Sequence, residues 1–214
     1  FSFPEEDLAI IEHDWQIIIE KVRIGKAHEI SEGDTMYLAA CTKGANASSV
    51  RKQPFSDIMA KQRAYSLKAS YMTQILNKYI FGDVKSERVI NDVKQLRNYS
   101  FEECVINKLV PFYGKTVSQL RQICHITSTA KNVNELILAK MLKVDGKISQ
   151  TEEFKKAGII PKTIRVQKNG KIKENMSFPT FNFIELSKED CWEESKLYNY
   201  LAPTKFLFVI FQEQ

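Results

Sequence analysis

Hydrophobic residues near the start of the chain recur at helical spacing. Pro4 and the three acidic residues after it are typical of a helix start, because proline fits the first turn and acidic side chains favour the positive end of the helix dipole. One apolar stripe follows, made of Leu8, Ile11, Trp15, Ile18, Ile19 and Val22. The pattern predicts a first helix that packs through this stripe.

Shorter elements are predicted up to residue 82. Apolar runs predict strands at 27–30 and 35–41, the second of them apolar enough to be buried on both faces. Residues 56–62 have the pattern of a short helix, and 63–68 that of an extended segment. A further helix is predicted to turn four apolar side chains inward, and these are Met72, Ile75, Leu76 and Tyr79.

The chain changes character after residue 82. Residues 83–99 are charged and weakly periodic, which is typical of a connector. Ser100 and Glu103 have the spacing of a capping box, in which each side chain satisfies a free backbone donor of a new helix. From Tyr113 a second unit is predicted to begin with two helices, the first of them capped by Thr116.

Strand patterns dominate the last part of the chain. We expect a mostly antiparallel sheet, a hairpin turn from Lys168 to Lys171 and a helix around 192–200. The strands of this sheet are predicted at 159–166, 172–178, 180–186 and 206–211.

The composition is that of a globular protein with a mild basic excess. The 214 residues are 43% hydrophobic and the net charge is +5. The first 33 residues hold eight acids and three bases, whereas 34–80 hold two acids and seven bases. This reversal indicates that one face of the protein turns toward a polyanion.

Several features bear on the setting of the protein. The four cysteines have no CxxC spacing, and no apolar run reaches the roughly 18 residues of a membrane span. We therefore expect free thiols, a cytoplasmic location and no membrane partner. The absence of an initiating methionine indicates a fragment of a longer protein.

The loop after the second predicted strand has the chemistry of a DNA contact. The run from Lys43 to Ser49 joins a cation, a flexible turn and short polar side chains, so that its donors can meet phosphate while Lys43 or Asn46 reaches a base edge. A plain surface turn explains the same residues. The nearby cations that would neutralise phosphate are Arg51, Lys52, Arg63 and Lys68.

A second basic run spans residues 155–173 and contains no acid. It favours contact with DNA, and a solvated hairpin tip is the alternative. Its members are Lys155, Lys156, Lys162, Arg165, Lys168, Lys171 and Lys173.

The same stretch resembles an incomplete nuclease site. Metal-dependent nucleases need at least two carboxylates that converge on Mg²⁺ and a nearby lysine. Glu153 supplies a leading acid and Lys162 a trailing lysine, but Ile160 stands where the second carboxylate is needed. One acid and one lysine are too few to bind and position the ion. This segment is therefore predicted to hold no metal and to have a nuclease-like fold without catalytic activity.

The residues resemble MutH and the related type II restriction endonucleases that recognise GATC. The resemblance is carried by Asp14-Trp15, by the run from Gly33 to Ser49 and by Gln53 to Thr73 on the recognition side. Residues 113–120, 136–142 and 153–162 resemble instead the front, catalytic half of such a domain. The order of the two halves is therefore reversed.

This resemblance implies a mixed α/β chain of the restriction-endonuclease-like, MutH-type fold, with a central mixed sheet flanked by helices. Residues 1–82 would be the recognition half of one domain, 83–112 a connector, and 113–214 the front half of a second, degenerate domain. A tandem protein explains this order, and a circular permutation is the alternative.

The resemblance also assigns roles to single residues. The family's Asp, Glu and Lys fall on Glu153, Ile160 and Lys162, and a helix-borne Glu falls on Ala139. Lys43, Arg63 and Lys68 match basic family positions, as does Lys131. Where MutH reads bases with an arginine, this chain has Cys41-Thr42-Lys43, so the base contact must move to Lys43 or Asn46.

The implied function is that of the DNA-binding part of a bacterial type II restriction endonuclease for GATC. The parent enzyme would use Mg²⁺ to hydrolyse double-stranded DNA, while this segment would act as a non-catalytic allosteric effector. Self-association on two-site DNA would follow from that role. The alternative is a DNA-binding or assembly module without a nuclease parent.

Overall fold

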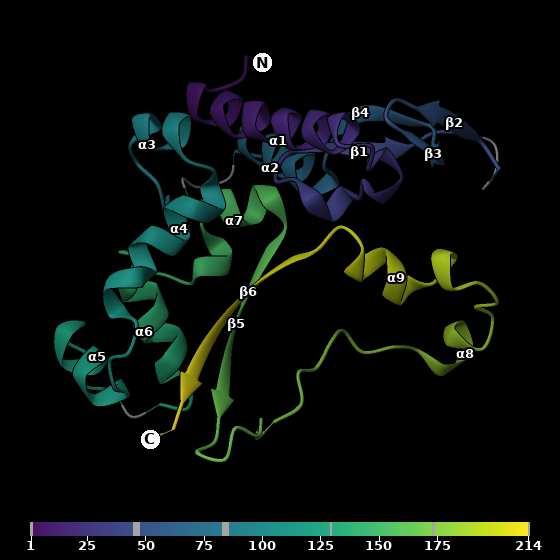
Figure 1. The fold of residues 1–214 in the computed structure, drawn as a ribbon. Coiled ribbons are helices and arrows are strands. Elements are labelled where there is room, and N and C mark those ends of the chain that lie inside the picture. The colour runs from purple at the N-terminus through teal and green to yellow at the C-terminus, as the bar shows by residue number, and fades with distance from the viewer. Residues whose placement is uncertain (1, 45–47, 83–85, 129, 173, 214) are drawn as a thin grey trace.

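The computed structural model describes residues 2–44, 48–82, 86–128, 130–172 and 174–213 as a mixed α/β structure (Figure 1). The helices are α1 (Glu5–Arg23), α2 (Ala69–Tyr79), α3 (Val93–Asn98), α4 (Phe101–Leu109), α5 (Val117–Ile123), α6 (Val133–Met141), α7 (Glu152–Ala157), α8 (Phe183–Leu186) and α9 (Lys196–Leu201). The strands are β1 (Leu38–Thr42), β2 (Val50–Gln53), β3 (Ser56–Lys61), β4 (Arg63–Leu67), β5 (Ile159–Val166) and β6 (Lys205–Gln212). Short 3-10 helices are η1 (Ala27–Glu29), η2 (Glu32–Asp34), η3 (Val110–Phe112), η4 (Ile148–Gln150) and η5 (Trp192–Glu194).

The described strands form three separate two-stranded sheets in place of one central sheet. β1 pairs with β4 and β2 with β3, both antiparallel, whereas β5 and β6 are parallel. Both directions occur, but none of the described sheets combines them, so the predicted central mixed sheet is wrong for this part of the chain. Among the described residues, no helix is long and apolar enough to cross a lipid bilayer.

The first helix is confirmed, and three residues of its predicted stripe, Ile11, Ile18 and Val22, pack on the core, but the rest of the buried face differs. Leu8 and Trp15 are exposed, whereas the acidic residues Asp7 and Asp14 are buried. Asp14 accepts hydrogen bonds from the backbone amides of Met36, Tyr37 and Leu38 at 2.6, 2.7 and 2.8 Å. Because three donors satisfy this carboxylate, α1 can turn an acidic face toward the protein interior.

The helix predicted after residue 69 is present as α2, and its inward face also differs. Met72, Leu76 and Tyr79 are exposed, while Ile75 packs on the main core. The fully buried residue is Tyr71, whose hydroxyl donates to Asp7 at 2.9 Å. This polar contact sets the rotation of α2, and an apolar pattern alone cannot reveal it.

Two short elements before residue 63 differ from the prediction. Residues 27–29 form η1 and not a strand. The backbone amide of Ala27 donates a hydrogen bond to the side chain of Gln53 (Oε1) at 2.8 Å, so it is not available to a neighbouring strand. The predicted helix at 56–62 is the strand β3, which pairs with β2 from Val50↔Lys61 to Gln53↔Ser56. A tight hairpin therefore overrides the local helical pattern.

The last part of the chain is less antiparallel than predicted. The turn from Lys168 to Lys171 is confirmed by the bond from Gln167 N to Lys171 O at 2.8 Å, but beyond it only the isolated bridge Val166↔Ile172 forms among the described residues. Residues 183–186 are the helix α8, capped by the side chain of Asn182. The chain then returns through α9, so that β6 enters beside β5 in the parallel direction.

One hydrophobic core joins segments that the sequence predicted to be separate. It contains Ile10, Tyr37 and Tyr71 together with Phe154 and Phe211. Residues of the predicted connector also belong to it, since Val89, Ile90 and Leu96 are fully buried. The capping boxes of Ser100 and Thr116 are present as predicted and fix the starts of α4 and α5.

Candidate nucleic-acid interface

Strands β1 to β4 form a ribbon that we call the arm, residues 38–67 with the gap at 45–47. The β2–β3 hairpin continues the β1–β4 ribbon through bonds from Lys43 N to Gln62 O at 2.7 Å and from Gln62 N to Ser49 O at 3.0 Å. Figure 1 shows the hairpin at one end of the molecule, near the C-terminal end of α1. A projecting ribbon of this kind can reach into a groove of DNA.

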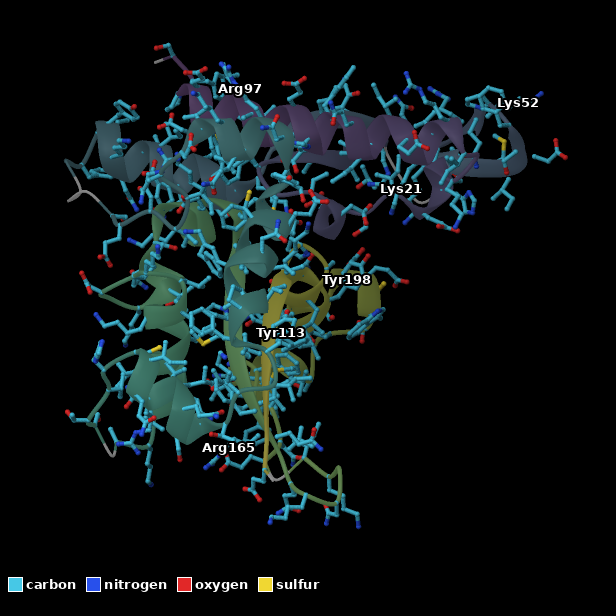
Figure 2. The ribbon with its side chains drawn as sticks, turned by 60° about the vertical axis from the view of Figure 1, so that its left-hand side comes forward. Lys21, Lys52, Arg97, Tyr113, Arg165 and Tyr198 are labelled. Carbon is cyan, nitrogen blue, oxygen red and sulfur yellow. The ribbon has the colours of Figure 1, made fainter. Side chains whose placement is uncertain are left out.

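Exposed cations gather on the arm. Lys43, Arg51 and Lys52 are exposed, as is Lys61, which the sequence did not single out. Figure 2 shows Lys52 at the outer end of the arm. The sequence from Lys43 to Lys61 contains one acidic residue, Asp57. The predicted base-reading residue Asn46 lies outside the described residues.

Two other cations that were predicted to bind DNA have their charged groups turned into the fold. Arg63 donates from Nη1 to the Ala40 carbonyl at 2.5 Å and from Nη2 to the Ile30 carbonyl, and burial lowers its pKa. Lys68 is buried and donates to the Thr35 carbonyl at 2.6 Å. Burial lowers the pKa of Lys68 to about 8. Both residues hold the arm to the segment before it, and neither presents its charge to solvent.

The second basic run is divided in the same way. Lys168 and Lys171 are exposed at the turn after β5, and Lys131 is exposed at the entry to α6. Lys155 is half-buried, with Nζ 3.3 Å from Ser86 Oγ. Lys162 is half-buried on β5, and Arg165 pairs with Glu174. Lys173 lies outside the described residues.

Lys156 belongs to a buried ionic cluster. Its ammonium lies 2.8 and 2.6 Å from the two carboxylate oxygens of Asp7 and 2.7 Å from Glu152. The same ammonium stands 5.5 Å from the ring centre of Tyr71, whose hydroxyl shares Asp7. The cluster joins α1, α2 and α7, so Lys156 stabilises the fold and is not free to meet phosphate in this structure.

The residues that the resemblance places at catalytic positions do not converge. Glu153 is fully buried, and its two carboxylate oxygens accept bonds from the amides of Val89 and Ile90 at 3.0 and 3.1 Å. Arg88 lies 3.5 Å from the same carboxylate. This acid therefore organises the segment before α3.

The remaining positions offer no partner acid to Glu153. Ile160 and Lys162 lie on one face of β5, beside Phe206 and Phe208 of β6, and Ala139 is buried in α6. Within the described ranges no three His, Cys, Asp or Glu side chains are grouped so as to hold a metal ion. These residues do not fit Mg²⁺, because the one carboxylate is fully buried, accepts from two backbone amides and lies beside Arg88, and its expected partner is an isoleucine.

The comparisons with known proteins agree with the resemblance at a coarser level. No family model matches the chain. The type II restriction enzyme Sau3AI of Staphylococcus aureus is 43% identical over 219 residues, which include 97% of this chain. The chain spans 45% of the length of that enzyme. Over nearly its whole length, this chain is therefore related to a type II restriction enzyme.

Proposed function

We propose that this chain is the DNA-binding part of a type II restriction endonuclease that recognises GATC. The observation that supports this most strongly is the projecting arm, on which Lys43, Arg51, Lys52 and Lys61 are exposed and almost unopposed by acids. Cations placed along a narrow ribbon neutralise successive phosphates and release counterions, which is the main source of affinity for DNA. The parent enzyme would act in the bacterial cytoplasm, where its DNA substrate lies.

We further propose that this segment carries no complete Mg²⁺ site and serves as an allosteric effector. The burial of the Glu153 carboxylate under two backbone amides and the apolar Ile160 support the first part. The exposed turn with Lys168 and Lys171 supports the second part, since it offers a cationic surface apart from the arm. Mg²⁺-dependent hydrolysis would belong to the rest of the parent enzyme, and two-site DNA would favour self-association.

The predicted division into 1–82, 83–112 and 113–214 stays a proposal about descent. All three segments contribute to the same hydrophobic core, for example through Tyr71, Ile90 and Phe154. We therefore propose that the recognition half of one MutH-like domain and the front half of another pack together as one folding unit.

Salt dependence tests the proposed interface. Replacing Lys43, Arg51 and Lys52 by alanine should lower the slope of log affinity against log salt by roughly 0.9 for each phosphate that the variant no longer neutralises. The matched control replaces Lys94, Lys115 and Lys147, which are also exposed and lie off the arm. Fluorescence anisotropy with a GATC duplex over a series of salt concentrations measures the slope. Equal slopes in both triple variants would contradict the proposal.

A further inference from the structure

Phe55 stands at the tip of the arm in an unfavourable conformation. It follows Pro54 in the tight turn between β2 and β3, and its φ is 62°. A bulky residue rarely adopts this left-handed region, because its side chain crowds the backbone there. The ring is nonetheless 80% exposed, so the strain is not offset by burial of the side chain.

The surrounding structure holds the backbone of this turn in place. A Cβ atom at Gly25 would lie 2.5 Å from the Phe55 carbonyl oxygen, so the glycine permits a close backbone approach. The side chain of Gln53, at the end of β2, accepts from Ala27 N of η1 at 2.8 Å and donates to Ile58 O beyond the turn at 2.6 Å. The backbone is therefore fixed while the ring projects into solvent.

The neighbours of the ring indicate what it meets. Lys52 and Arg51 are exposed on the strand that enters the turn, and Ile58 and Met59 are 54% and 45% exposed on the strand that leaves it. An apolar tip flanked by cations matches DNA, in which stacked bases lie between two rows of phosphates. Proteins that insert apolar side chains between base steps combine these features.

We propose that Phe55 is a wedge that enters the DNA base stack and unstacks one base step, while Arg51 and Lys52 hold the adjacent phosphates. The inference rests on the proposed DNA-binding function and adds a contact to the bases. Its physical basis is that the backbone at Phe55 is already held in place, so that little backbone freedom is lost when the ring stacks on a base.

Duplexes that carry 2-aminopurine in place of single adenines, within and beside GATC, report unstacking as a rise in fluorescence. With the 214-residue chain we expect a rise at one or two neighbouring positions. Phe55→Ala should abolish the rise and weaken binding roughly five- to 150-fold, the range for removal of one base–aromatic stack. It should leave the salt slope unchanged, because no charge is removed. Phe183→Ala is the matched control, since Phe183 is also 80% exposed and lies in α8.

A second variant separates binding from stability. Phe55→Gly should raise the Tm by about 2–4 °C, because glycine relieves the left-handed strain, and should still abolish the fluorescence rise. If the ring instead stabilised the hairpin, Phe55→Gly would lower the Tm.

The outcomes distinguish the wedge from the wider proposal. One outcome is that Phe55→Ala keeps both the fluorescence rise and the affinity for the duplex, while the arm cations still determine the salt slope. In that case the wedge proposal is wrong, but the proposed DNA binding is supported. If the wild-type chain binds no duplex at low salt, both fall. Binding to polyglutamate with no change at any 2-aminopurine position would assign the tip to an acidic protein partner and overturn the wedge.

Discussion

Lys52 and Lys156 both come from runs with the charge pattern of a DNA contact, yet their surroundings differ. The Lys52 side chain is exposed at the end of the arm, whereas the Lys156 ammonium lies 2.6 Å from Asp7 inside the fold. The sequence predicts the charge of a residue, but tertiary packing decides whether that charge faces solvent. The buried acids Asp7 and Asp14 show the same limit, since their partners are remote in sequence.

Lys68 gives this burial a measurable consequence. Its pKa is lowered to about 8 in the folded protein, below its ordinary value of 10.5, because burial disfavours the charged form. Between these values the unfolded chain binds more protons than the folded one, so stability should rise with pH. We expect a gain of about 1–2 kcal/mol between about pH 8 and 9.5. Tyr71 acts in the opposite direction above about pH 10, since burial raises its pKa.

Urea unfolding at several pH values between these limits measures the effect. Lys68→Met should remove the rise, while Lys52→Met, a change of the same kind at an exposed site, should keep it. Burial raises the pKa of Cys104 and Cys124, and these thiols oppose Lys68 in this window in both proteins. A difference in stability between wild type and Lys68→Met that does not grow with pH would show that Lys68 keeps an ordinary pKa.

Elements that depend on local signals could be predicted, and those that depend on distant partners could not. The caps at Ser100 and Thr116 and the turn at Lys168–Lys171 follow from neighbouring residues, and all three are present. The helix predicted in place of β3 is wrong, because the state of that segment depends on pairing with β2. The parallel pairing of β5 with β6 depends on a return through α8 and α9 that strand patterns do not specify.

The same distinction applies to the candidate site. The missing carboxylate at Ile160 can be read from the sequence, and so can the cations of the arm. The hydrogen bonds from the amides of Val89 and Ile90 to Glu153 cannot be read from the sequence, because those donors lie 64 and 63 residues away along the chain. Phe55 is equally hidden, since an aromatic residue in a sequence is more often buried than presented at a strained turn.

One core joins the arm-bearing segment to the segment that we propose to be catalytically degenerate. A ligand on the second segment can influence the parent enzyme only through a difference in affinity between its inactive and active arrangements. Under the proposed effector role, such coupling would pass through the continuous core, in which α2 and α7 meet at the Asp7–Lys156 cluster.

This coupling predicts how the cleavage rate of the full-length parent enzyme depends on the number of recognition sites in the DNA. It should cut two-site DNA faster per site than one-site DNA, and an uncleavable GATC oligonucleotide should partly restore the one-site rate. Replacing Lys168 and Lys171 by alanine should weaken this activation more than basal cleavage, whereas replacing Lys94 and Lys147 should not. Equal per-site rates on both substrates across enzyme concentrations would remove the effector role.

We propose that this chain binds GATC DNA without cutting it. One experiment tests both the binding and the absence of cleavage. The chain is incubated with a supercoiled GATC plasmid and Mg²⁺, and native and deproteinised samples are compared on a gel. We expect retarded migration in the native sample and intact supercoiled plasmid after the protein is removed. Nicked or linear plasmid that disappears with Lys162→Ala would contradict the account, because contaminating nuclease cannot depend on that residue.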